Sequence, residues 1–163
     1  MQILTFTLDD IDFGIPMNSV DFISERTGVL EIPGTLEHVK GIVTLRGIIM
    51  PVYSLGSRFG YIDQDIKNLV VINMAGMTLG IEVGKVNEII NIEKDKIMDM
   101  ENDVIIPLPE VLESEKQCIQ NVLVRRKQMI LLIDINRLLT AVEKRELHQL
   151  VEDSAKDELV VSS

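Results

Sequence analysis

The stretch that most constrains the fold of this chain is Gly41–Gly60, which reads GIVTLRGIIMPVYSLGSRFG. An apolar run over Ile42–Leu45 is interrupted by Arg46-Gly47 and then resumes over Ile48–Tyr53. The β-branched residues in both runs favour a pleated sheet, and glycine tolerates the positive φ of a tight turn. The segment therefore predicts a β-hairpin with its turn at Arg46-Gly47, followed by a short helical turn.

Apolar side chains alternate with other residues through most of the first two thirds of the chain. Leu4, Phe6 and Leu8 would share one face of a first strand, and Asp9-Asp10 would make the turn that follows it. Thr35 could cap a helical turn over residues 36–39. Further strands are predicted at Ile11–Ile15, Met17–Ser24, Leu69–Met74, Thr78–Val83, Val86–Ile92, Val122–Val124 and Met129–Ile133. About nine short strands predict an all-β barrel architecture.

A helix is predicted near the C-terminus, where Ile135, Leu138, Leu139 and Val142 have the i, i+3, i+4, i+7 spacing of a buried stripe. The later apolar positions are out of phase with this stripe. The helix therefore either bends or is followed by a second short helix that begins near Glu143. Beyond residue 153 the tail is polar, and we expect it to fray.

The composition narrows the classes of function. Hydrophobic residues make up 46% of the 163 residues but aromatic residues only 4%, so the core must be aliphatic. A net charge of −10 disfavours nucleic acid and anionic lipid surfaces as partners. With Cys118 as the single cysteine, no signal peptide, and no uncharged run long enough to insert into a membrane, the sequence predicts a cytoplasmic protein.

No arrangement of residues predicts catalysis, a metal ion or another cofactor. His38 and His148 lie far apart in the sequence, and Cys118 is most simply a buried small hydrophobic residue. An enzyme would need a pair such as Cys118 and His38 within hydrogen-bond reach. The acidic residues between 95 and 103 lack the glycine and the closing glutamate of a calcium loop. We therefore predict a non-enzymatic binding module without cofactors.

The chain resembles the CheW-like domain of bacterial chemotaxis coupling proteins over roughly Gln2 to Leu139. The family signature Gly-Val-x-Asn-Leu-Arg-Gly…Pro-Val-x-Asp-Leu is similar to Gly41–Gly47 followed by Pro51–Leu55, and a later family motif is similar to Gly80–Ile89. Phe22 stands where the family has an acidic residue. The other departures from the family pattern are Thr44, Ser54, Gly84 and Asn121.

The resemblance implies a mainly β fold of two small five-stranded SH3-like barrels packed together, with a C-terminal helix. Residues 1–142 would form the CheW-like domain, and residues 143–163 the helix and a flexible acidic tail. The two halves also echo each other, because Phe13-Gly14-Ile15 and Leu79-Gly80-Ile81 are each followed by apolar residues six and nine positions after the glycine. This echo is in keeping with two related barrels.

The function implied by the resemblance is that of an adaptor between the cytoplasmic tips of chemoreceptors and a CheA-type histidine kinase, recruited to receptor arrays at the inner face of the membrane. The kinase regulatory domain would bind at barrel ends and the receptor hairpin in the groove between the barrels. Arg46 would contact polar groups near the receptor tip. The remaining partner-binding residues implied are Val20, Gly41, Leu79, Gly80, Val86 and Ile89.

Two other interpretations of these residues stay open. Each apolar position in the groove could simply belong to the core, whereas a charged side chain on a hairpin turn, such as that of Arg46, favours the surface. A different class of function is a small-ligand-binding or sensory β-barrel that uses the groove between the barrels as its pocket. A deep, closed cavity with convergent polar groups would favour that alternative.

Overall fold

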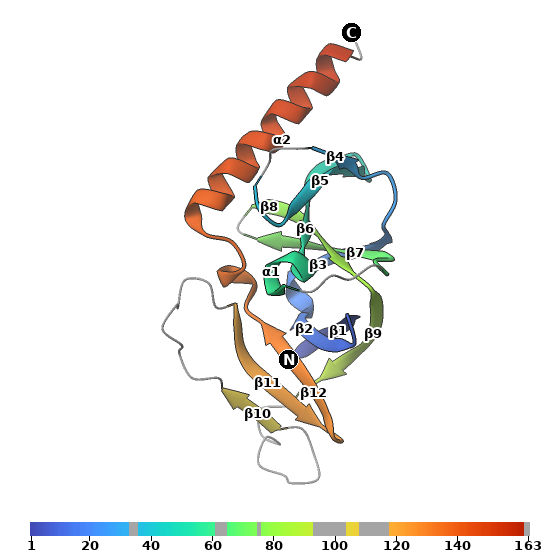
Figure 1. The fold of residues 1–163 in the computed structure, drawn as a ribbon, viewed down its shortest axis with the longest axis vertical. Coiled ribbons are helices and arrows are strands. Elements are labelled where there is room, and N and C mark those ends of the chain that lie inside the picture. The colour runs from blue at the N-terminus through green and yellow to red at the C-terminus, as the bar shows by residue number, and fades with distance from the viewer. Residues whose placement is uncertain (33–35, 61–64, 75, 93–103, 108–117, 162–163) are drawn as a thin grey trace.

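The computed structural model describes residues 1–32, 36–60, 65–74, 76–92, 104–107 and 118–161. Its strands form two six-stranded sheets, and the C-terminal helix α2 (Ala141–Val161) lies against the second of them. Figure 1 shows the two sheets following one another along the long axis, with α2 at one end and β10 to β12 at the other. The prediction of a mainly β fold with a C-terminal helix is confirmed.

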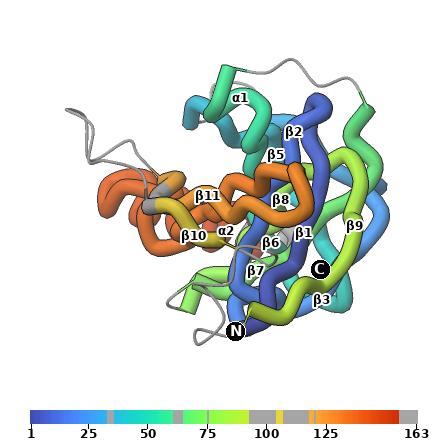
Figure 2. The backbone as a smooth tube through the Cα atoms, turned by 90° about the horizontal axis from the view of Figure 1, so that it is seen from below, coloured from blue at the N-terminus to red at the C-terminus, as the bar shows by residue number. Residues whose placement is uncertain are grey.

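The first sheet has the strand order β10-β11-β12-β2-β1-β9. Its strands are β1 (Gln2–Leu8), β2 (Ile11–Pro16), β9 (Lys85–Asn91), β10 (Val104–Pro107), β11 (Ile119–Arg125) and β12 (Gln128–Ile133). Neighbouring strands are antiparallel except for β12 and β2, which run parallel. Figure 2 shows β9 following β1 at the edge of this sheet.

The second sheet has the strand order β3-β7-β8-β6-β5-β4. Its strands are β3 (Val20–Glu25), β4 (Leu30–Glu31), β5 (Val39–Leu45), β6 (Ile48–Ser54), β7 (Asn68–Met74) and β8 (Met77–Val83). Here β6 and β8 are the parallel pair. Each sheet has one strand more than the five expected, because the sequence did not reveal the short edge strands β4 and β10.

The two glycine-containing segments that echo each other occupy equivalent places in the two sheets. Gly14 on β2 lies beside Leu132 of the parallel strand β12, and Gly80 on β8 lies beside Val52 of the parallel strand β6. In both cases the next strand crosses to the other sheet, since β3 belongs to the second sheet and β9 to the first. The exchange of strands ties the two halves together.

Hairpin turns were the best predicted local features. Asp9-Asp10, Arg46-Gly47 and Arg126-Lys127 each have positive φ at both residues, between 47° and 75°. Two-residue turns of this kind match the twist of the strands that they join. The predicted turns at Asp9-Asp10 and Arg46-Gly47 are confirmed.

The main core lies between the two sheets and is mostly aliphatic. It is built from fully buried side chains of both sheets, among them Phe6 and Phe13 from the first and Ile72 and Leu79 from the second. Leu147 of α2 completes it with no exposed surface. Smaller apolar clusters fill the outer part of each sheet. Because both sheets contribute side chains to this core, they pack as one unit.

The structure agrees with the second form of the helix prediction in its start, since a separate helix begins near Glu143, but that helix is not short and the predicted fraying after residue 153 is wrong. Residues Ile135–Arg137 form a separate 3₁₀ turn, η3, and α2 begins only at Ala141. Thr140 and Glu143 make a reciprocal capping box, with each backbone N–H donating to the other's side chain at 3.1 Å. The predicted stripe therefore divides between two elements, and the helix continues to Val161 instead of fraying after residue 153.

The remaining local expectations had mixed outcomes. The helical turn after the hairpin is confirmed as α1 (Leu55–Phe59), but the strand expected from Met17 begins with a 3₁₀ turn, η1 (Met17–Ser19). No helical turn covers residues 36–39, because His38 has a φ of 70° and β5 begins at residue 39. Thr35, the acidic stretch 93–103 and most of the segment 107–117 lie outside the described residues.

Candidate protein-binding surface

Arg46 lies on the exposed turn between β5 and β6, and its side chain lies over Phe22 of the edge strand β3, which is not a sheet neighbour of either strand. The guanidinium carbon is 4.0 Å from the centre of the Phe22 ring. This cation–π contact contributes about 0.5–1 kcal/mol at an exposed site. Within the described residues Arg46 makes no ion pair with a carboxylate, so its N–H groups face solvent. The sequence did not reveal the contact with Phe22.

Gly41 has a structural reason to be glycine. A Cβ atom at this position would lie 2.0 Å from the backbone oxygen of Leu30, on the short strand β4. Gly41 therefore allows β4 to approach β5. Gly80 differs, because a Cβ there would meet Met50 Sδ at 3.5 Å and Pro51 O at 3.7 Å, both ordinary contacts. Gly80 is buried and does not enforce a close approach.

Of the four apolar groove positions, Val20 and Val86 are half-buried and border the main core from different sheets. Val20 opens β3, the edge strand of the second sheet, and Val86 lies on β9, the edge strand of the first. Ile89, also on β9, is 52% exposed. Leu79 is fully buried, and Ile72 separates it from Val20 in the sheet. Leu79 is thus a core residue.

The candidate surface therefore follows two sheet edges. On β3 it comprises Val20, Phe22 and the 40%-exposed Ile23, with Arg46 held above the ring of Phe22. On β9 it comprises Val86 and Ile89. Edge strands present unpaired backbone groups together with their side chains, which suits them to contact another protein. We call these six residues the edge surface.

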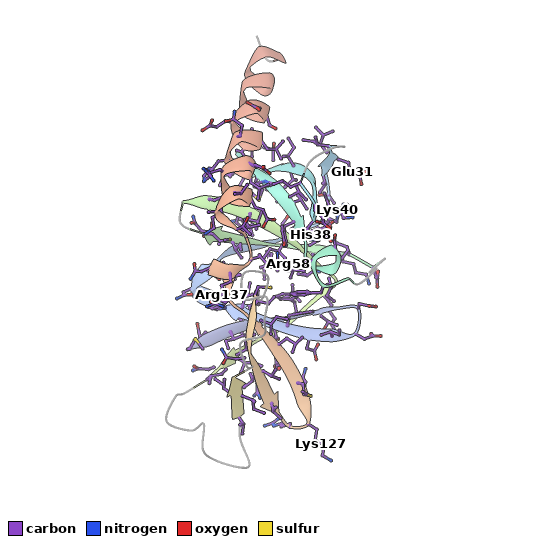
Figure 3. The ribbon with its side chains drawn as sticks, turned by 60° about the vertical axis from the view of Figure 1, so that its left-hand side comes forward. Glu31, His38, Lys40, Arg58, Lys127 and Arg137 are labelled. Atoms are coloured by element: carbon purple, nitrogen blue, oxygen red, sulfur yellow. The ribbon has the colours of Figure 1, made fainter. Side chains whose placement is uncertain are left out.

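The residues considered for catalysis do not form a catalytic pair. The Nδ1 atom of His38 is 2.7 Å from the hydroxyl oxygen of Ser57, and its ring meets the edge of Tyr53. Cys118 is 1% exposed, and burial raises the pKa of its thiol, so the sulfur stays protonated at neutral pH. Within the described residues no hydrogen bond joins Cys118 to His38. Figure 3 shows His38 near Arg58, which is a residue of α1.

The structure also bears on metal and membrane binding. Among the described residues no group of three or more histidine, cysteine, aspartate or glutamate side chains could hold a metal ion. The acidic residues between 95 and 103 lie outside that set. No helix in the described part of the chain is both long enough and apolar enough to cross a bilayer.

A hollow of about 460 Å³ lies where the two sheets meet. It is bordered by the start of β1, the end of β2, η1, the end of β7, β11 and η3. Asn18, Asn73 and Asn136 on its border are exposed, so the hollow is open to solvent. It is therefore not the deep, closed cavity that would favour a small-ligand sensor.

A comparison with family models matches the CheW-like domain to residues 2–143 of this chain. The chain belongs to the CheW-like domain family. Its fold is thus that of two SH3-like subdomains, and it is a scaffolding protein of chemotaxis, a class of proteins that are not enzymes.

Relatives share the CheW-like fold at low sequence identity. The chemotaxis protein CheW of Klebsiella aerogenes is 26% identical over 146 residues, which cover 87% of this chain and 83% of the relative. The CheW of Treponema pallidum is 25% identical over a match that covers 91% of this chain and 88% of the relative. The crystal structure of the scaffolding protein TtCheW from Thermoanaerobacter tengcongensis has a TM-score of 0.72 and 25% identity, covering 86% of this chain and 88% of that one.

The departures from the CheW-like pattern have distinct local consequences. Ser54 still caps α1, because its Oγ atom accepts a hydrogen bond of 3.1 Å from the backbone N–H of Ser57. Gly84 bonds through its backbone, whose N–H donates to Thr7 O at 3.1 Å and whose carbonyl accepts from the side-chain Nδ2 of Asn68 at 3.2 Å. Thr44 is exposed on β5, and Asn121 borders the hollow.

Proposed function

We propose that this CheW-like protein is an adaptor that couples chemoreceptors to a CheA-type histidine kinase in the cytoplasm. The receptor's helical hairpin would lie along the edge surface, and the kinase regulatory domain would bind at a barrel end. Family membership and the exposed apolar side chains at the edges of both sheets support this proposal. Helices that bind in grooves typically insert apolar side chains at i, i+3 and i+4 spacing.

The observation that carries the proposal is the arrangement of Arg46 above Phe22. A guanidinium held over a ring keeps its planar set of five N–H donors ready for carbonyl or carboxylate groups of a partner. The same contact restrains a long side chain, which lowers the entropy lost when the partner binds. Val20 and Ile23 face the side of β3 opposite to Phe22 and would add apolar contacts along the same edge.

The division of the chain at residue 142 is part of the proposal. The family match ends at residue 143, which supports a CheW-like domain over residues 1–142 followed by an appended helix. The helix is nevertheless anchored, because Leu147 reaches the main core. We infer that the first half of α2 stabilises the domain and that its far end extends beyond the second sheet (Figure 1).

The test is a binding titration with a receptor cytoplasmic fragment and, separately, with the kinase regulatory domain. Arg46→Ala should weaken binding of the receptor fragment about tenfold, the size of effect typical of a central arginine, and leave kinase binding unchanged. Arg126→Ala is the matched control, because Arg126 is also an exposed arginine at the first position of a two-residue hairpin turn, with φ 47° against 51°.

A second pair of variants tests the apolar part of the edge surface. Ile89→Asp places a charge on β9, at a position that is 52% exposed, and should weaken receptor binding severalfold. Met129→Asp is the control, since Met129 is 63% exposed on the hairpin at the opposite end of the molecule from α2. Figure 3 shows Lys127, which is two residues earlier, at the tip of that hairpin. Binding to neither partner by the wild-type protein would overturn the adaptor proposal.

A further inference from the structure

We propose that the hollow between the two sheets binds a short, neutral peptide segment that carries one aliphatic side chain. Its volume of about 460 Å³ falls within the range of about 300–1,000 Å³ that is common for ligand sites, which often occur where two structural units meet. The hollow is separate from the edge surface, since none of the six residues of that surface borders it. The inference therefore does not depend on the proposed adaptor function.

The border of the hollow carries four side-chain amides from four different elements. Asn18 lies on η1, Asn73 on β7, Asn121 on β11 and Asn136 on η3. Within the described part of the chain, none of these four amides makes a hydrogen bond with another protein group. A side-chain amide offers one carbonyl acceptor and two N–H donors, which complements the carbonyl and N–H of a peptide unit. Four such groups could pair with the backbone of a short segment.

The floor of the hollow is apolar. It includes Ile3, Ile15, Met74 and Leu132 from three strands of the first sheet and one of the second. A Cβ atom at Gly14 would lie 2.7 Å from Ile3 Cγ2 and 3.0 Å from Leu132 Cδ2, so these side chains already meet over the glycine. An aliphatic side chain inserted from the mouth would lose its contact with water against this floor.

The charge and shape of the lining exclude other classes of ligand. Asp134 is the only charged side chain among the described lining residues, and the N-terminal ammonium of Met1, the cation of this lining, donates a hydrogen bond of 2.7 Å to Ile92 O. Its carboxylate accepts a hydrogen bond of 3.0 Å from the backbone N–H of Asn136 and lies 3.9 Å from Arg137 Nε. The described lining contains no aromatic side chain, so it lacks the stacking surface that nucleobases favour.

The test uses the ¹⁵N-labelled full chain and capped tripeptides followed by NMR. N-acetyl-Ala-Leu-Ala-amide should cause saturable shifts of the side-chain amide signals of Asn18, Asn73, Asn121 and Asn136. N-acetyl-Ala-Ala-Ala-amide should bind more weakly because it lacks the aliphatic anchor. N-acetyl-Glu-Leu-Glu-amide should also bind more weakly, because a dianion approaches Asp134 on a chain with a net charge of −10.

Variants locate the binding. Asn73→Ala and Asn136→Ala should each raise the dissociation constant for the leucine peptide about threefold or more, because each removes hydrogen bonds to it. Asn91→Ala on β9 is the control, since Asn91 is exposed and does not border the hollow. Backbone spectra of each variant confirm that the fold is retained.

Three results would overturn the inference. They are an absence of saturable shifts up to about 20 mM leucine peptide, equal binding by the asparagine variants, and equal or stronger binding of inorganic phosphate or glucose at the same site. The titration requires neither receptor nor kinase. Its failure would therefore leave the adaptor proposal standing, and failure of the adaptor proposal would leave this one standing.

Discussion

The guanidinium of Arg46 lies 4.0 Å from the centre of the Phe22 ring and connects a hairpin turn to an edge strand. Phe22 stands where the resemblance to the family places an acidic residue. An acidic side chain there would hold the arginine by an ion pair and occupy its N–H donors. The aromatic ring leaves those donors available, which makes this pair the centre of the proposed receptor contact.

Phe22→Leu tests the role of the ring. Leucine retains most of the packing against the outer apolar cluster but cannot hold the guanidinium. We expect the free energy of unfolding to fall by no more than about 1–1.5 kcal/mol and receptor binding to weaken about threefold. Calorimetric titration and urea unfolding measure the two effects. Receptor affinity equal to that of the wild type would show that the ring does not organise Arg46 for binding.

The ion pair between Arg26 and Glu82 should contribute to stability. Glu82 is only 3% exposed on β8, and its carboxylate accepts a hydrogen bond from Arg26 Nε. Arg26→Ala would leave this carboxylate without its charged partner and should reduce the free energy of unfolding by roughly 2–3 kcal/mol, less than for a fully buried pair because Arg26 is partly exposed.

The control for that prediction is Lys67→Ala, which breaks the exposed ion pair with Asp65 and should cost less than about 0.5 kcal/mol. Urea unfolding of both variants makes the comparison. Equal effects would mean that Arg26 and Glu82 behave as an ordinary surface pair.

The two glycines of the family motifs should respond differently to alanine. Gly41→Ala brings a Cβ atom to 2.0 Å from Leu30 O, and backbone must move to relieve this clash. We expect a loss of about 2–3 kcal/mol of stability, whereas Gly80→Ala meets only ordinary contacts and should cost less than about 1.5 kcal/mol. Thermal and urea unfolding measure both, and the reverse order would contradict the described approach of β4 to β5.

Leu147 anchors α2 to the main core. Leu147→Ala removes a fully buried side chain and should destabilise the protein by about 2–5 kcal/mol. Val142→Ala, near the start of the same helix and 52% exposed, should change stability by less than about 0.5 kcal/mol. If truncation of residues 143–163 left the unfolding midpoint unchanged, α2 would not be part of the folded domain.

Stability should fall at alkaline pH. Burial raises the pKa of the Cys118 thiol and that of the Tyr53 hydroxyl above their ordinary values, and nearby Arg58 offsets this only in part. Above about pH 9 the unfolded chain releases these protons while the native protein retains them, so the free energy of unfolding decreases as pH rises. Tyr53→Phe and Cys118→Ala should each flatten this decrease in urea unfolding between pH 7 and about 10.5. An unchanged slope in both variants would contradict this cause.

The strands were predictable because their signals are local. Alternation around Phe6 and the turn residues at Asp9-Asp10 and Arg46-Gly47 fix strand and turn without reference to the rest of the chain. The helix start was predictable only as one of two alternatives, since Ile135 and Leu138 have helical spacing although Thr140 caps the helix later. Spacing of apolar residues cannot distinguish one helix from a 3₁₀ turn followed by another.

The candidate surface was only partly predictable, because exposure depends on the strand order of the sheets. Arg46 was expected at the surface from its turn, and Val20 and Ile89 lie at sheet edges. Leu79 has the same apolar character but lies two strands inside the sheet and is fully buried. Neither the contact between Arg46 and Phe22 nor the gathering of four asparagines around one hollow follows from sequence spacing, because the residues come from separate elements.

The most direct test of the adaptor account compares Arg46→Ala and Arg126→Ala in titrations with a receptor cytoplasmic fragment and with the kinase regulatory domain. The account predicts that the wild-type protein binds both partners, that Arg46→Ala weakens receptor binding about tenfold without affecting kinase binding, and that Arg126→Ala changes neither. Equal receptor affinities for the two variants would contradict the placement of the receptor on the edge surface. Binding of the wild-type protein to neither partner would contradict the adaptor function itself.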